Sequence, residues 1–125
     1  MSEKLNRIRK IDVENWVWVI YIFIIIFSFI ANKKEKEYIL YGDENSKIEY
    51  QKLMTIIFTV LVIIYYYFTK SSYEDVINLN ISDSFKKKRL TNLSFIGSML
   101  VLISGIIFLY IIINDDNLDT EISFN

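Results

Sequence analysis

The sequence predicts an all-α membrane protein in which three transmembrane helices form an antiparallel bundle. Three stretches contain no charged side chain, at residues 15–32, 53–69 and 90–114. An α-helix rises about 1.5 Å per residue, so about 18 residues cover most of a hydrocarbon core about 30 Å thick. Hydrophobic residues make up 53% of the chain, and the charges are confined to the segments between the apolar stretches. A soluble three-helix bundle would instead carry Lys and Glu on one face of every helix.

The first apolar stretch follows basic residues, as the apolar part of a signal peptide does. Cleavage after Ala31 would leave Phe29 at the minus-three position, where a small residue is required. We therefore predict an uncleaved first span, and a single membrane domain that comprises residues 1–125.

Capping signals predict where the next helices begin. Ser46 and Glu49 have the spacing of a capping box, which places the start of the second helix near Lys47. Ser72 begins a similar but looser pattern, which suggests a short interfacial helix after the second span. Asp83 is the predicted cap of the third helix, with residues 84–113 following it.

The distribution of basic residues predicts the orientation in the membrane. Lys and Arg number four in residues 1–14, five in 32–52, five in 70–89 and none in 115–125. With three spans, one side of the membrane carries nine basic residues and the other five. The positive-inside rule places the N-terminus in the cytoplasm and the C-terminus outside, and we predict the plasma membrane as the location. Aromatic residues typical of the headgroup region lie on the same predicted inner side: Trp16, Trp18, Tyr21, Tyr65, Tyr66 and Tyr67.

Composition argues against an enzyme, a cofactor site, a metal site and a nucleic-acid partner. The net charge of −1 creates no long-range field for nucleic acid. The chain lacks both histidine and cysteine, which removes the usual proton shuttle and the thiolate ligands. The apolar stretches hold no charged group that could bind an ion or relay protons.

The third span carries a stripe of small residues that predicts a helix-packing surface. Membrane helices associate through close backbone approach and small polar contacts, because lipid provides no hydrophobic drive for pairing. A stripe on the second span would face it in an antiparallel pair, with Tyr66 near Ser94 and Ser98, and Thr59 near Ser104 and Gly105. Internal packing is one interpretation, and oligomerisation or a pore lining is the other. The predicted packing residues are Ser94, Gly97, Ser98, Ser104 and Gly105 on the third span and Thr55, Thr59 and Tyr66 on the second.

Four consecutive basic residues precede the third span: Lys86, Lys87, Lys88 and Arg89. Each such residue near an anionic leaflet contributes about 1 kcal/mol of attraction. We predict that this cluster contacts anionic lipid and helps to set the orientation. Recognition of an acidic partner is the alternative.

Two segments on the predicted outer side have strand-like patterns. Residues 37–41 are mostly apolar and precede Gly42, and residues 118–124 alternate apolar and polar side chains. A short β-pairing between these segments is one hypothesis, and an unstructured tail is the other.

These observations predict a small non-catalytic membrane protein that acts through contacts. We expect an accessory or assembly subunit that associates with membrane lipid and with a larger membrane protein. The alternative is a homo-oligomeric pore similar to a phage holin, since some holins are small and have three spans. Holins generally end in a basic cytoplasmic tail, whereas residues 115–125 are acidic and predicted to lie outside.

Overall fold

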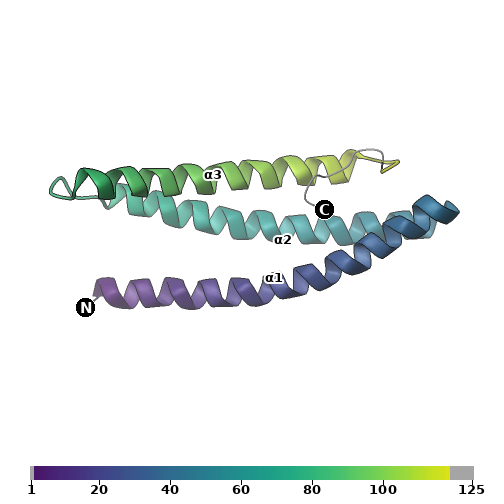
Figure 1. Cartoon of the computed structure of the whole chain (residues 1–125), viewed down its shortest axis with the longest axis horizontal. Coiled ribbons are helices and arrows are strands. Elements are labelled where there is room, and N and C mark those ends of the chain that lie inside the picture. Colours follow the sequence, from purple (N-terminus) through teal and green to yellow (C-terminus); the bar gives the residue numbers. More distant parts are fainter. Residues whose placement is uncertain (1, 119–125) are drawn as a thin grey trace. The chain divides into compact units, whose positions relative to one another are not determined.

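The computed structural model describes residues 2–118 and contains three helices, α1 (Ser2–Tyr41), α2 (Glu44–Ile77) and α3 (Phe85–Asn114) (Figure 1). Each helix is long and apolar enough to cross a membrane. The prediction of an all-α chain with three such helices is therefore confirmed. Three apolar helices of this length indicate an integral membrane protein.

The chain forms two compact units whose boundary lies inside α2, between Ile57 and Phe58. The first unit contains α1 and the beginning of α2. The second contains the remainder of α2 together with α3.

The helices extend well beyond the charge-free stretches. With 40 residues, α1 is about 60 Å long, whereas the hydrocarbon core is about 30 Å thick. Most of the segments predicted as loops, residues 32–52 and 70–89, are consequently helical. Lys and Glu are good helix formers, and the sequence holds no proline that would end a helix.

The first connection is a tight turn at Gly42 and Asp43. Gly42 has a φ of +63°, a left-handed conformation that glycine adopts without strain, and its N–H donates to the Tyr38 carbonyl at 2.8 Å. Asp43 caps α2, because its Oδ1 accepts from the Asn45 N–H at 3.1 Å. The predicted start of the second helix near Lys47 is therefore too late by about one turn.

Ser46 does not form the predicted capping box with Glu49. It lies in the first turn of α2, is only 2% exposed, and its hydroxyl donates to two carboxylates. The distances from Ser46 Oγ are 2.8 Å to Glu37 Oε2 and 2.9 Å to Asp43 Oδ2. The serine thus joins the end of α1 to the beginning of α2.

One ion pair of Lys34 joins the same two helices, and a second lies within α1. Lys34 Nζ lies 2.9 Å from Glu49 Oε2 and 3.8 Å from Glu37 Oε2. The hydrogen bond to Glu49, followed by the charge of Glu37, raises the pKa of the Lys34 ammonium above its usual value. The polar extensions of α1 and α2 therefore form an antiparallel hairpin beyond the apolar stretches.

The predicted β-pairing between residues 37–41 and 118–124 is wrong for its first segment. Residues 37–41 form the last turn of α1, and no strand occurs between residues 2 and 118. Nothing interrupts the helix before Gly42, and the Lys34 and Ser46 contacts of Glu37 stabilise its end. Residues 119–124 of the predicted second strand lie outside the described part of the chain.

The second connection, residues 78–84, also differs from the prediction. No short interfacial helix begins at Ser72, because α2 continues without a break to Ile77. Ser84 is the N-cap of α3, and its hydroxyl accepts from the Lys87 N–H at 3.1 Å. Asp83, the predicted cap, instead accepts from the Asn80 N–H at 2.8 Å. This backbone hydrogen bond, together with Lys87, lowers the pKa of the Asp83 carboxyl.

Candidate functional site

In the second unit, α2 and α3 form an antiparallel pair (Figure 1). On each helix, one series of buried or half-buried positions recurs in steps of three and four residues, the spacing at which two helices pack with a slight left-handed crossing. On α2 these buried or half-buried positions are Phe58, Val62, Tyr65, Thr69, Ser72 and Val76. On α3 they are Thr91, Phe95, Ser98, Leu102, Gly105, Leu109 and Ile112.

Gly105 lies in close contact with side chains of α2. A Cβ atom added to Gly105 would lie 3.0 Å from Tyr65 Cδ2 and 3.4 Å from Val62 Cγ2. Ordinary carbon contacts are about 3.5–4.0 Å, so the space beside Gly105 is already filled. The absence of a side chain at this position allows the Tyr65 ring to pack against the α3 backbone.

Hydroxyl groups join the helices nearer to the 78–84 turn. Thr69 Oγ1 lies 2.8 Å from the Tyr65 carbonyl oxygen and 3.1 Å from the Ser98 carbonyl oxygen, and donates to both. Ser72 Oγ and Ser98 Oγ are 3.2 Å apart and share a hydrogen bond. Such interhelical bonds contribute about 0.6–2 kcal/mol within a membrane protein.

Aromatic pairs lie on either side of these contacts. The Tyr73 and Phe95 rings are 5.5 Å apart near the turn, and the Phe58 and Phe108 rings are 6.0 Å apart toward the other end. The second pair has the edge-on geometry that aromatic rings favour. The α2–α3 pairing therefore extends along most of α3.

The structure brings only part of the predicted small-residue stripe into contact with α2. Ser98 and Gly105 make the contacts above, whereas the exposed positions are Ser94, Gly97 and Ser104. Ser98 and Gly105 therefore belong to the α2–α3 pairing, and the other three positions remain open on α3.

The predicted stripe on α2 is displaced from the observed one. Tyr66 is 60% exposed, and its neighbour Tyr65 occupies the position against Gly105. Thr59 is exposed, and the Thr55 hydroxyl donates to the Gln51 carbonyl of its own helix at 2.6 Å. The partners of Ser98 and Gly105 lie about one helical turn further along α2 than predicted. The prediction aligned the charge-free stretches and thereby ignored the polar helical turns at the end of α2.

The exposed part of the stripe forms a surface that we call the open flank of α3, consisting of Ser94, Gly97, Val101 and Ser104. A Cβ atom added to Gly97 would meet nothing within 4 Å in the described part of the chain, and Val101 is 47% exposed. The flank repeats in steps of three and four, the same spacing as the α2-facing positions.

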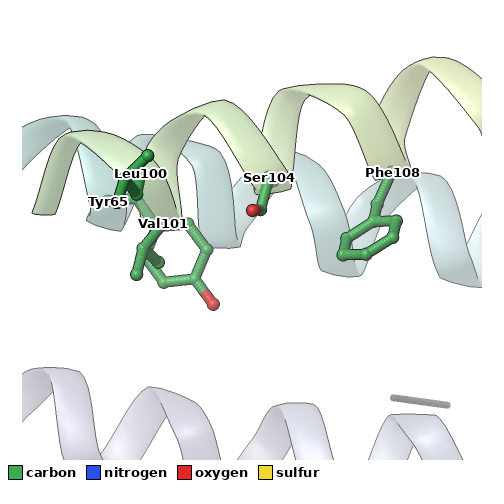
Figure 2. A pocket seen from close by; sticks show the side chains of 6 residues that line it. Tyr65, Leu100, Val101, Ser104 and Phe108 are labelled. Atoms are coloured by element: carbon green, nitrogen blue, oxygen red, sulfur yellow. The ribbon is translucent and has the colours of Figure 1, made fainter. Parts of the chain in front are cut away.

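A pocket of about 280 Å³ opens beside the flank. Its lining consists of Tyr65, Leu100, Val101, Ser104, Gly105 and Phe108. Figure 2 shows the Ser104 hydroxyl and the Phe108 ring on the same side of α3, with the Tyr65 ring from α2 below Val101. The pocket is mainly apolar, and two of its lining residues, Tyr65 and Ser104, carry hydroxyl groups.

The predicted lipid-contact residues occupy the first turns of α3. Lys86, Lys87 and Arg89 are exposed, and Lys88 is half-buried.

No protein-family model, curated protein or solved structure matches this chain.

Proposed function

We propose that this protein is a non-catalytic accessory or assembly subunit that binds a transmembrane helix of a larger membrane protein. The proposed binding surface is the open flank of α3. The main support is that the backbone at Gly97 is exposed, so that another helix can approach it closely.

The chemistry of the flank supports a helical partner. Small side chains permit close backbone approach, and hydroxyl groups can donate across a helix interface. Ser98 and Gly105 pair with α2 through these two types of contact. Ser94, Gly97 and Ser104 repeat the same chemistry on an exposed face.

The adjacent pocket supports a protruding apolar side chain on the partner. Leu100, Val101 and Phe108 provide apolar walls, and the volume of about 280 Å³ exceeds that of a large side chain. Protruding side chains that fill pockets are typical anchors of protein interfaces. The proposed partner therefore presents small residues opposite Gly97 and a large apolar residue opposite the pocket.

Charge supports an orientation with the 78–84 turn in the cytoplasm. Residues 32–52 contain five basic and five acidic residues, and ion pairs involve Lys34 and Lys47. Residues 78–89 contain four basic residues and one acidic residue. By the count of Lys and Arg, on which the positive-inside rule rests, residues 1–14 and 70–89 carry nine and the other side carries five, which supports an N-terminus inside and a C-terminus outside.

Substitution Gly97→Leu tests the proposed function. Tagged wild-type and variant chains are extracted from the native host in mild detergent and analysed by native mass spectrometry. We expect the wild type to retain a larger membrane protein at fixed stoichiometry. The variant should lose it by at least about tenfold, because a leucine prevents close helix approach.

A matched control distinguishes a specific effect at the open flank from a general effect of a larger side chain on α3. Ile103 is 46% exposed and lies on a different face of the helix, so Ile103→Phe should leave the partner bound. Equal retention of the partner by wild type and Gly97→Leu would contradict the proposed surface. A wild-type assembly that contains many copies of this chain alone would support the homo-oligomeric pore instead.

A further inference from the structure

The four basic residues at the beginning of α3 have different surroundings. Lys87 Nζ donates to Asp83 Oδ1 at 3.3 Å, and Lys88 Nζ donates to the Ile81 carbonyl at 3.0 Å. Both side chains therefore help to fold the 78–84 turn. Within residues 2–118, Lys86 and Arg89 have neither an ion-pair partner nor a side-chain hydrogen bond.

Helical geometry places the two unpaired cations on one face. At about 100° per residue, Phe85, Lys86 and Arg89 fall within an arc of about 100°. This arc lies opposite the face through which Ser98 and Gly105 contact α2. The cluster thus divides into a pair that serves the turn and a pair that points away from α2.

The same face continues into the membrane as an exposed apolar strip. Leu93, Ile96 and Leu100 follow the cations along the helix and are 53%, 49% and 60% exposed. Next to the cations, Ile81 is 97% exposed and Phe85 is 79% exposed. Cations at the end of an exposed apolar strip match the arrangement of a phospholipid, whose charged headgroup adjoins its acyl chains.

Charge balance favours an anionic headgroup. Asp83 is the only acidic residue in residues 78–89, and it already pairs with Lys87. Arg can bind phosphate oxygens through two parallel hydrogen bonds, and Lys acts as a mobile point charge beside it. The excess positive charge is therefore concentrated where a lipid phosphate would lie.

We propose that Lys86 and Arg89, together with the strip of Leu93, Ile96 and Leu100, bind one anionic phospholipid. The two cations hold its phosphate, and an acyl chain lies along the strip. Phe85 and Ile81 insert beside the headgroup at the membrane surface. Arg89 and Ile96 lie on a different face of α3 from the open flank, and of the strip only Leu100 also lines the pocket beside that flank.

Two double variants with the same net charge test the site. Lys86→Gln/Arg89→Gln removes the proposed ligands, and Lys87→Gln/Lys88→Gln is the matched control. Each protein is reconstituted in nanodiscs of equal parts phosphatidylcholine and phosphatidylglycerol. Native mass spectrometry then measures the lipids that stay bound to the protein when it is released from the nanodisc. We expect the wild type to retain phosphatidylglycerol preferentially. The first variant should reduce this preference by about tenfold, and the control by about twofold or less.

Circular dichroism checks that both variants keep the helix content of the wild type. An equal loss of preference in the two double variants would overturn the site, since lipid binding would then follow total charge alone. An unchanged preference in Lys86→Gln/Arg89→Gln would overturn it as well. A wild type that retains both lipids equally would show that no anionic lipid is selected.

Discussion

Replacing Gly105 with leucine is expected to force α2 and α3 apart and to lower the free energy of unfolding by about 3 kcal/mol. Even a Cβ atom at this position would lie 3.0 Å from the Tyr65 ring, and leucine adds three further carbon atoms. Displacement of the ring would also separate Thr69 and Ser72 from Ser98, which removes the interhelical hydrogen bonds. Titration with SDS from mild detergent, followed by far-ultraviolet circular dichroism, measures the change.

Gly97→Leu is the matched control for Gly105→Leu. Both changes replace a glycine in the same helix with the same residue, but the space beside Gly97 is open. We expect Gly97→Leu to leave the SDS unfolding midpoint within experimental error. If the two variants were equally destabilised, the structural distinction between the α2-facing positions and the open flank would be wrong.

Phe58→Ala is expected to destabilise the second unit by about 2 kcal/mol. Phe58 is 1% exposed, and its ring packs edge-on against Phe108 at 6.0 Å between centroids. In a water-soluble core the loss would be about 3–5 kcal/mol. Lipid is as apolar as the side chain, so the loss inside a membrane comes mainly from the cavity and the missing contacts.

The control for Phe58→Ala is Phe23→Ala. Phe23 lies in the apolar part of α1 and is 56% exposed, so lipid chains can fill the space that the smaller side chain leaves. The same SDS titration should show little change for Phe23→Ala. Similar losses in both variants would mean that packing against Phe108 does not contribute to stability.

The number and type of helices could be predicted from the sequence, but their ends could not. Charge-free stretches locate apolar helices because a charged group in the hydrocarbon core is costly. They do not locate helix ends, since a helix can continue into water wherever its residues favour it. The end of α1 at Tyr41 depends on Gly42 and on contacts of Glu37 with Lys34 and Ser46. The contact between Glu37 and Ser46 brings together residues from two helices, so a local sequence pattern does not reveal it.

The predicted packing residues show a similar division. Small residues on α3 identify one side of the helix, and Ser98 and Gly105 on that side contact α2. The sequence alone did not separate these two from Gly97 and Ser104, because the neighbouring positions differ by a small rotation of the helix. On α2, the packing positions Phe58, Tyr65 and Thr69 were missed, although together with Val62 they recur in steps of four and three that are visible in the sequence.

We propose that the chain crosses the membrane three times, with its N-terminus and the 78–84 turn in the cytoplasm. The sequence contains no cysteine, so single cysteines report position without background. Ser2→Cys, Asn45→Cys and Ser82→Cys place a thiol at the beginning of α1, in the first turn of α2 and between α2 and α3. In intact cells, a membrane-impermeant thiol reagent should label only Asn45→Cys, and the other two should react after permeabilisation. Equal labelling of all three in intact cells would contradict membrane spanning, and labelling of Ser2→Cys and Ser82→Cys alone would contradict the orientation.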